Sequence, residues 1–464
     1  MSERHPLTPY RPRDAADILD MLVVGQPISL VGLSNFGKST LLRHMAQPAF
    51  ARSYEQRVGH PALFVYVDCN RMLEMSAQGF YEVILRAATE MLSAQTPAPH
   101  ALMERLDDLY RTVVQSQNSF TIPLAFNDAL LALIQDDESQ EVILMLDEFD
   151  AVLTGLDERV FLNMRALKDS YSAQLNYIIA TLRPTTSLDV GDDLAEFLEP
   201  FGAYKHYLEP LAPSDAERLA ADIFHQAHDS LDPAERDFIL NQAGGHPGLI
   251  HAVAHVVMEV ESGAPVTYTE QALQVANDVL GNHRLVRSEM IKLWNQLVPA
   301  EREWATLVAT QGVDALSDVE RTALLARGVL VSDDQGPRLF GRLFENYARR
   351  QRLIQQEVPA GVWVDIDAGV VWVDGRRVEA LTDLEYRLLL LLYGRLDKIC
   401  DKYQIVDTVW GQEYMGEVDD ARIEKLVSRL RSKLEPDPSK PQFISTIRGR
   451  GYKLNSVQSA SNLA

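Results

Sequence analysis

Cysteine is scarce in this chain, which has only Cys69 and Cys400 among its 464 residues. The two cysteines are far apart in sequence, fall in different predicted domains and have no neighbours at metal-ligand spacing. This scarcity argues against a disulfide-stabilised secreted domain and against a cysteine-based zinc site. A reducing location is the natural expectation.

Long apolar segments are missing as well. Met1–Pro12 is polar and lacks the apolar core of a signal peptide. Apolar runs such as Leu388–Tyr393 are far shorter than the roughly 20 residues that cross a bilayer. The sequence also lacks internal repeats and low-complexity segments. We therefore expect a cytoplasmic protein with no membrane partner.

Positive charge is sparse over most of the chain, whose formal net charge is −22. A protein this acidic does not coat nucleic acid over its whole surface. From Ala421 to Lys453, however, nine basic residues stand against three acidic ones, a net +6 that leaves −28 for the rest. This asymmetry marks one segment as the candidate contact with an anionic partner.

The length suits three or four domains of roughly 100–200 residues each, and the 46% apolar content supplies their cores. Up to about residue 205, short apolar runs alternate with helical stretches, which is typical of a parallel α/β sheet. Four runs have the composition of strands buried on both faces. They are Ile28–Val31, Ala62–Val67, Val142–Leu146 and Tyr177–Thr181.

Helices are expected beyond residue 205, where the strand pattern stops. Ser214–His225 and Glu270–Leu280 have amphipathic periodicity, and the glycine-rich Gly244–Gly248 lies between them. More helices follow, and then two short apolar runs flank the polar turn Ser332–Gly336. Helices followed by a hairpin outline a small winged helix.

These patterns predict a multidomain α/β + α protein. Its first part has the parallel-sheet core, and its last part is a winged helix-turn-helix with an N-terminal β-sheet. The predicted parts are a core over 1–205, a helical segment over 206–285, a first winged helix over 286–350, a linker over 351–359, the C-terminal domain over 360–456 and a frayed tail over 457–464.

A phosphate-binding loop is predicted at Gly32–Thr40, which fits the pattern Gly-x4-Gly-Lys-Ser. A strand precedes it and a helix follows it, so its N–H groups and the helix N-terminus favour an anion. Lys38 would bind the β- and γ-phosphates, and the Ser39 hydroxyl would ligate Mg²⁺. The alternative, a chance glycine turn, fits this context poorly. The expected ATP or ADP contacts are Gly32, Asn35, Phe36, Gly37, Lys38, Ser39 and Thr40.

Two further strand ends complete the predicted nucleotide site. Asp147 would hold the Mg²⁺ shell, and Glu148 would orient or deprotonate the attacking water. Thr181 and Arg183 end another strand beside the same crevice, where Arg183 would sense the γ-phosphate. The alternatives are a strand that merely ends in acids and a surface arginine before a proline. The predicted catalytic residues are Lys38, Glu148 and Arg183.

These motifs together resemble the STAND branch of AAA-related P-loop ATPases, which includes NACHT proteins and archaeal-type ATPases. Leu208–Leu211 resembles the start of the family's helical lid, and Gly245–Pro247 resembles its Gly-x-Pro motif. The resemblance covers roughly residues 1–350 and implies that Pro247 lies against the adenine. It also implies a closed ADP-bound state and an open, often oligomeric ATP-bound state. His246 would either approach a phosphate or be structural, and no arginine finger supplied in trans is evident.

The predicted helix Asp420–Leu434 has two stripes of side chains. Its apolar stripe consists of Ile423, Leu426, Val427, Leu430 and Leu434, and its basic stripe of Arg422, Lys425, Arg429 and Lys433. A helix anchored on one face and basic on the other fits a DNA major groove, although a solvated charged face is the usual meaning of such a stripe. The strand–glycine turn–strand pattern of Ile444–Lys453 predicts a wing.

The last domain resembles the OmpR/PhoB-type DNA-binding domain over nearly its whole length. Its motifs are Leu381-Thr382-x-x-Glu385, in which Glu385 would complete a capping box, Val409-Trp410-Gly411, Arg429-Leu430-Arg431-x-Lys433-Leu434 and Arg448-Gly449-x-Gly451-Tyr452. The resemblance implies double-stranded DNA as a partner. Arg422 and Lys425 would face bases, Arg429, Arg431, Thr446 and Arg448 would hold phosphates, and Arg450 would probe the minor groove.

Three features of this resemblance concern the partners and the domain organisation of the protein. Residues 411–418 correspond to the segment that contacts RNA polymerase in relatives. Ala421 and Leu426 depart from the family's pattern of an arginine and a polar residue, so a base preference cannot be carried over. The receiver domain of such proteins is not visible, and the predicted ATPase occupies its place.

Both ends together predict a transcriptional regulator whose nucleotide state controls DNA binding or homo-oligomerisation, with slow ATP hydrolysis as the switch. One alternative is a DNA-associated ATPase that acts on a partner complex in transposition, replication loading or phage defence. Another is an assembly scaffold that uses DNA as its anchor.

Overall fold

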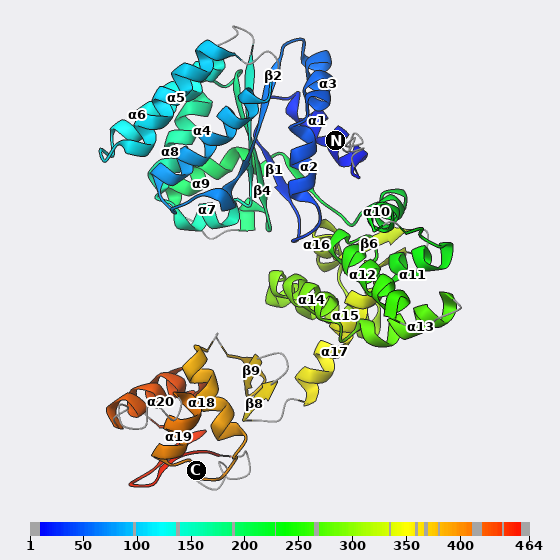
Figure 1. Cartoon of the computed structure of the whole chain (residues 1–464), viewed down its shortest axis with the longest axis vertical. Helices are drawn as coiled ribbons and strands as arrows, with labels where there is room; N and C mark the ends of the chain where they lie inside the picture. The colour runs from blue at the N-terminus through cyan, green and yellow to red at the C-terminus, as the bar shows by residue number, and fades with distance from the viewer. Residues whose placement is uncertain are drawn as a thin grey trace. The chain divides into compact units, whose positions relative to one another are not determined.

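The structure is a computed structural model of the whole chain. It divides into two compact units, Met1–Arg349 and Arg350–Ala464, which are described separately (Figure 1). The described residues are 10–95, 99–135, 140–187, 191–227, 229–263, 269–333, 336–357, 361–365, 370–378, 381–410, 420–438 and 440–455.

The first unit is built on a five-stranded sheet of order β2-β3-β4-β1-β5, in which neighbouring strands are parallel. The strands are β1 (Ile28–Val31), β2 (Ala62–Asp68), β3 (Glu141–Asp147), β4 (Leu175–Thr181) and β5 (Lys205–Tyr207). All residues of β1, β3 and β4 are buried, which explains why these strands are continuous apolar runs. The four predicted strands are confirmed.

The expectation that strands stop after about residue 205 is wrong by one short strand. β5 pairs with β1 from Ser29↔Lys205 to Val31↔Tyr207 and closes one edge of the sheet. Its three residues are polar or aromatic and only partly buried. An edge strand of this kind has no apolar run by which a sequence could reveal it.

Helices cover both faces of the sheet, and the strand residues alternate between the two layers (Figure 1). In β3, Ile143 and Met145 join one hydrophobic cluster, while Val142, Leu144 and Leu146 join the other. The first layer contains α1 (Pro12–Leu22), α2 (Lys38–Met45) and α3 (Pro48–Val58). The second contains α4 (Ala77–Ser93), α5 (His100–Gln115), α6 (Thr121–Gln135), α7 (Asp150–Gly155), α8 (Glu158–Ser170) and α9 (Asp192–Leu198).

A helical region follows β5 and confirms both predicted amphipathic helices. Its helices are α10 (Pro213–Gln226), α11 (Pro233–Ala243), α12 (Pro247–Gly263) and α13 (Thr269–Leu280). The next helices are α14 (Arg284–Gln296), α15 (Pro299–Gln311) and α16 (Asp318–Ala326), followed by the antiparallel hairpin β6 (Leu330–Asp333) and β7 (Gly336–Leu339) and by α17 (Arg342–Glu357). Helices and then a hairpin form the predicted first winged helix.

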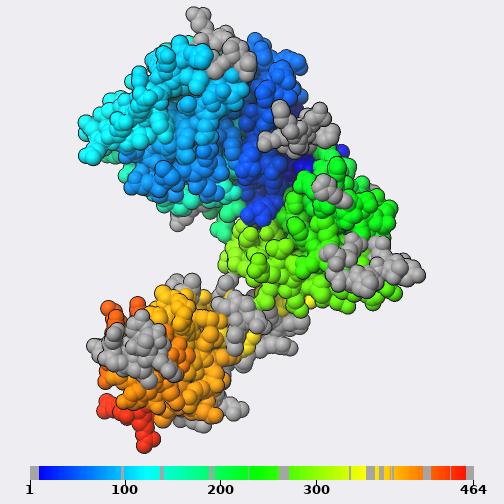
Figure 2. Space-filling view, in the orientation of Figure 1, coloured from blue at the N-terminus to red at the C-terminus, as the bar shows by residue number. Residues whose placement is uncertain are grey.

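One hydrophobic cluster runs from the α1–α3 layer through the loop residues Leu33 and Phe36 into the helical region and the first winged helix. In the space-filling view, the blue start of the core and the green helical region lie in contact (Figure 2). The predicted phosphate-binding loop is therefore part of the packing between these regions.

The second unit is a small α/β domain with its own core. Its strands β8 (Val362–Asp365), β9 (Val370–Val373) and β10 (Arg376–Arg377) form an antiparallel sheet. Three helices follow, α18 (Asp383–Tyr393), α19 (Lys402–Val409) and α20 (Asp420–Leu434), and then the hairpin β11 (Ile444–Ile447) and β12 (Gly451–Leu454).

The predicted N-terminal β-sheet, the helix Asp420–Leu434 and the strand–turn–strand pattern of Ile444–Lys453 are confirmed. Residues 366–369, the motif residue Gly411, the segment 411–418 and the predicted tail 457–464 lie outside the described residues. Across the described parts of the chain, no helix has both the length and the apolarity to cross a membrane.

Candidate functional site

The Gly32–Thr40 loop leaves the carboxyl end of β1 and leads into α2, as its sequence predicts. Left-handed backbone at Asn35 (φ 59°) and Gly37 (φ 93°) curls the loop, the kind of conformation that gathers N–H groups around an anion. The Gly32 N–H donates to the Thr181 carbonyl at 3.1 Å. This bond ties the loop to the end of β4.

Lys38 lies inside the loop and is only 5% exposed. Its ammonium donates to the Gly32 carbonyl at 2.7 Å and lies 3.4 Å from the Leu33 carbonyl. Burial lowers the pKa of Lys38, while the charges of Glu148, Asp150 and Asp147 oppose that shift. The loop therefore holds a buried cation in the field of three carboxylates.

Those carboxylates lie at the last residue of β3 and just after it. Asp147 is buried and accepts from the Tyr66 hydroxyl at 2.8 Å and from the Glu148 N–H at 3.0 Å. Glu148 has the positive φ of 54°, and burial raises the pKa of its carboxyl group. Asp150, which the motif argument did not include, accepts from the Leu182 N–H through both carboxylate oxygens at 3.0 Å.

The end of β4 connects the sheet to α14. The Thr181 hydroxyl donates to the Arg183 carbonyl at 2.7 Å, and the Arg183 guanidinium donates to the Gln296 carbonyl at 3.3 Å. The Gln296 side chain accepts from the Ser34 N–H at 2.7 Å. The structure thus brings Lys38, Asp147, Glu148, Thr181 and Arg183 to one edge of the sheet, beside α14.

Phe36 and His246 pack behind the loop. The Phe36 ring is buried, with its centroid 5.0 Å from that of His246 and 6.4 Å from that of Phe340. The His246 Nδ1 accepts from the Leu249 N–H at 3.1 Å, and its Nε2 lies 3.3 Å from the Ser34 carbonyl. Burial lowers the pKa of His246 to about 3, so a neutral ring donates to Ser34.

These contacts bear on the roles predicted for Phe36 and His246. The Phe36 side chain is buried against His246 and Phe340, so a nucleotide contact of Phe36 would have to come from its backbone. Of the two roles left open for His246, the contacts favour the structural one. The Gly-x-Pro motif does lie against the loop, because a Cβ at Gly248, next to Pro247, would come within 2.9 Å of the Asn35 Cβ.

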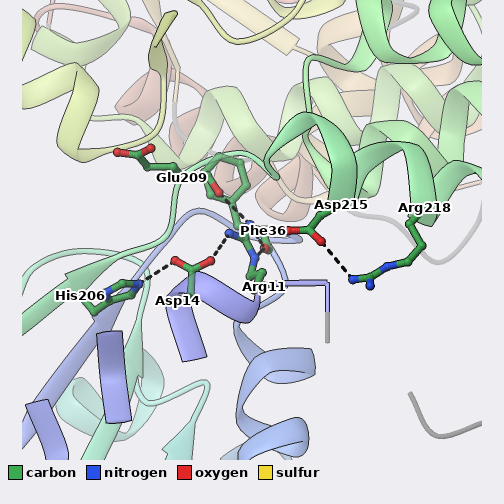
Figure 3. Close-up of polar contacts among 7 residues, drawn as sticks. All are labelled: Arg11, Asp14, Phe36, His206, Glu209, Asp215 and Arg218. Atoms are coloured by element: carbon green, nitrogen blue, oxygen red, sulfur yellow. Dashed lines mark hydrogen bonds and ion pairs between the residues drawn. The ribbon is translucent and has the colours of Figure 1, made fainter. Parts of the chain in front are cut away.

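A polar cluster around Arg11 was not predicted from the sequence (Figure 3). The buried Arg11 guanidinium donates to the Phe36 carbonyl at 3.1 and 2.6 Å and to the Glu209 carbonyl at 2.7 Å. Asp14 accepts from Arg11 at 3.0 Å and lies 2.7 Å from the His206 Nε2. Burial alone would raise the pKa of Asp14, but its contacts with His206 and Arg11 lower it. Arg11 thus joins the loop to the segment between β5 and α10.

In the second unit, α20 is anchored through its apolar stripe. The side chains of Arg422, Lys425 and Arg429 are exposed along the helix, and Arg448 and Arg450 are exposed at the tip of the β11–β12 hairpin. All five residues of the apolar stripe are buried: Ile423, Leu426, Val427, Leu430 and Leu434.

Two residues predicted to contact DNA phosphates, Arg431 and Thr446, also form hydrogen bonds within the domain. The Arg431 guanidinium donates to the Ile444 carbonyl at 3.1 and 2.6 Å and to the Thr446 hydroxyl at 2.8 Å. These bonds join α20 to β11. Lys433 of the basic stripe donates to the buried Glu385 at 2.8 Å, and Glu385 also accepts from the Thr382 N–H at 2.9 Å, as the predicted capping box requires.

Glu435 was counted in the sequence only as an acid within a basic segment. Its buried carboxylate accepts from the N–H groups of Gln442, Phe443 and Ile444 at 2.7 to 3.0 Å. It therefore fixes the start of the hairpin relative to the end of α20. A lone acid after a helix offers no sequence pattern that would reveal this role.

The family match of the sequence lies in the second unit. Residues 376–454 match the family described as "Transcriptional regulatory protein, C terminal". The chain is 40% identical over 83 residues to the uncharacterized transcriptional regulatory protein YrkP of Bacillus subtilis, which is 18% of this chain and 35% of that protein. It is 39% identical over 93 residues to the sensory transduction protein RegX3 of Mycobacterium leprae, which is 20% of this chain and 46% of that protein.

The chain thus spans about a third to a half of the length of these curated relatives. Among solved structures, it is similar to the Walker-type ATPase Paby2304 of Pyrococcus abyssi, with a TM-score of 0.43 and 13% identity. That similarity covers 73% of this chain and 95% of the Pyrococcus protein.

Proposed function

Because residues 376–454 form an OmpR/PhoB-type winged-helix DNA-binding domain and the first unit has the fold of a P-loop ATPase, we propose that the chain is an ATP-dependent switch that regulates transcription. Its nucleotide state controls DNA binding or homo-oligomerisation. One observation carries the proposal: Ser34 and Asn35 of the phosphate-binding loop are hydrogen-bonded to Gln296 and Glu289 of α14. A ligand of the loop would therefore act on α14, which belongs to the helical region and first winged helix that we propose as the moving part.

The nucleotide is ATP or ADP with Mg²⁺, and the buried cation and the three acids at the sheet edge fit such a ligand. Lys38 would bind the β- and γ-phosphates, Ser39 and Asp147 would hold Mg²⁺, and Pro247 would lie against the adenine. Glu148 would act on the attacking water, and Arg183 would sense the γ-phosphate. The remaining contacts would come from Gly32, Asn35, Gly37, Thr40 and Thr181 and from the backbone of Phe36.

The proposed switch depends on competition between protein groups and the phosphates for the same hydrogen-bond donors. The Ser34 N–H binds the Gln296 side chain, and the Lys38 ammonium binds the Gly32 carbonyl. Phosphate oxygens accept hydrogen bonds from the same kinds of donor. A nucleotide would therefore bind with different affinity to a loop held by α14 and to a loop released from it, and such a difference is what shifts an equilibrium.

On the DNA side, α20 would lie in the major groove. Arg422 and Lys425 would face bases, while Arg429, Arg431, Thr446 and Arg448 would hold phosphates. Arg450, at the tip of the wing, would enter the minor groove. A contact of residues 411–418 with RNA polymerase is part of the same proposal.

The test is DNA footprinting on the upstream region of the protein's own gene, with ADP, with a slowly hydrolysed ATP analogue and without nucleotide. The matched variant is Lys38→Ala, which should lose nucleotide binding. We expect the affinity or the length of the footprint to change with nucleotide in the wild type and to stay constant in Lys38→Ala.

Identical footprints in all nucleotide states would reject the switch and leave the winged helix as a passive tether. The hydrolysis rate distinguishes the switch from the main alternative, a DNA-associated ATPase that acts on a partner complex. Slow, nearly stoichiometric turnover agrees with a switch, whereas sustained hydrolysis stimulated by DNA would favour that alternative.

A further inference from the structure

Arg327 ends α16 in the first winged helix, and its side chain is only 5% exposed. Its Nε lies 3.1 Å from a Glu301 carboxylate oxygen of α15, and its Nη1 donates to the Leu182 carbonyl. Its Nη2 is buried and has no hydrogen-bond partner among the described residues. An unpaired buried donor is unfavourable, so its position calls for a physical reason.

The neighbouring glycine explains how this arginine comes so close to the loop. Gly328 has a φ of +68°, and a Cβ there would lie 2.6 Å from the Phe36 ring and 3.2 Å from the Leu208 carbonyl. Only glycine fits a left-handed position this crowded. The turn after α16 therefore packs directly on the phosphate-binding loop, and Arg327 enters the edge of the sheet beside Leu182.

Charges of both signs act on Arg327. Burial lowers the pKa of Arg327, and the nearby Arg183 lowers it further, against the charge of Glu301. The positive charge of Arg327 in turn acts on Lys38 and lowers its pKa, after the larger effect of burial. Arg327 and Arg183 thus meet at the end of β4, where Arg327 holds the Leu182 carbonyl next to Arg183. The ligand that suits two such guanidinium groups is an anion with several acceptor oxygens.

We propose that Arg327 binds the terminal phosphate of ATP, supplied in cis by the first winged helix, and that it makes the site prefer ATP over ADP. The inference rests on the proposed nucleotide site and adds a residue from outside the core to it. The Nη2 group of the guanidinium has no hydrogen-bond partner among the described residues, and a phosphate oxygen would provide one. Because Arg327 also holds Leu182, next to Arg183, the phosphate would connect the winged helix with the end of β4.

The experiment uses the full chain and calorimetric titration with Mg²⁺ and either ADP or a slowly hydrolysed ATP analogue. In Arg327→Gln, we expect affinity for the ATP analogue to fall tenfold or more, while affinity for ADP stays within about twofold. Arg327→Lys should recover part of the loss, because it restores the charge without the fork. Arg321→Gln, on the same helix, is the control and should bind both nucleotides like the wild type.

Thermal unfolding without nucleotide separates this role from a purely structural one. Equal losses for ADP and the ATP analogue, with a lowered melting temperature in Arg327→Gln and Arg327→Lys, would overturn the inference and leave Arg327 as a packing residue. Unchanged binding of both nucleotides in Arg327→Gln would also overturn it, with the nucleotide site intact. A wild-type chain that binds neither nucleotide would reject the nucleotide site itself.

Discussion

His246 illustrates at the scale of one residue how burial decides protonation. Its folded pKa is about 3, below the value of about 6.5 for an unfolded histidine. As the pH falls below about 6.5, the unfolded chain binds the proton first, so stability is full above that pH and is lost toward pH 3. We expect the free energy of unfolding to drop by about 2 kcal/mol between pH 7 and pH 5 from this residue.

The measurement is urea unfolding of the wild type and of His246→Asn at both pH values. The variant has no imidazole to protonate, so it should lose about 2 kcal/mol less than the wild type over this interval. Equal losses in the two proteins would contradict the neutral, buried ring.

Glu148 carries the second prediction at this scale. Burial raises the pKa of its carboxyl group, and a general base acts only in its deprotonated form. The rate of ATP hydrolysis should therefore fall as the pH decreases, with a midpoint above the ordinary glutamate value of about 4.3. Glu148→Gln should keep nucleotide affinity and lose hydrolysis by roughly 100-fold or more. Hydrolysis at the wild-type rate in Glu148→Gln would exclude Glu148 as the base.

The site residues that a sequence can indicate are those marked by a local pattern. Lys38 belongs to a contiguous motif, and Asp147 and Thr181 end strands whose apolar runs announce them. Arg11 was missed because its partner Glu209 lies 198 positions away. Arg327 was missed for the same reason, since Leu182 is 145 positions distant. Contacts set by the fold leave no local pattern.

At the scale of elements, Glu435 joins the recognition helix to the wing. In Glu435→Ala, three backbone N–H groups would lose their acceptor, two of them in buried residues. We expect the second unit to lose about 3 kcal/mol of unfolding free energy. Chemical unfolding measures this, with Glu424→Ala, an exposed acid of α20, as the control. Equal stability of the two variants would show that water replaces the carboxylate.

The exposed basic face of α20 gives a prediction about DNA. Arg429→Ala should weaken binding to all sequences alike and reduce the salt dependence, the slope of log K against log salt concentration, by about 0.9. Arg387→Ala, on the exposed surface of α18, removes the same charge outside the proposed interface and should change neither quantity. An unchanged slope in Arg429→Ala would argue against the placement of α20 in the groove.

Elements were predictable where one physical factor dominated. Strands β1 to β4 could be located because burial on both faces requires continuous apolar runs, and α20 because its apolar stripe repeats at helical spacing. β5 escaped since an edge strand of three residues needs no such run. Helices α11 and α12 lie in the region where only a glycine-rich separator was recognised, and their positions depend on packing with their neighbours.

At the scale of the whole molecule, the two proposed functions of the chain lie in regions of opposite net charge. The segment Ala421–Lys453 has a net charge of +6, and the remainder has −28. Phosphate contacts supply much of the affinity of a DNA-binding protein, so in the proposed DNA complex a chain acidic elsewhere would confine DNA to this segment. Control of DNA binding by nucleotide would then act through an equilibrium that affects the binding of both ligands.

Such control has a quantitative consequence, because coupling between two binding sites is reciprocal. If the ATP analogue strengthens DNA binding by a given factor, saturating DNA must strengthen binding of the analogue by the same factor, typically about 5- to 150-fold. Calorimetric titration of the analogue with and without DNA measures that factor directly. Lys38→Ala should remove the effect of nucleotide on DNA, and DNA lacking the site should leave nucleotide affinity unchanged. A footprint that depends on nucleotide, together with a nucleotide affinity that ignores DNA, would contradict an equilibrium switch.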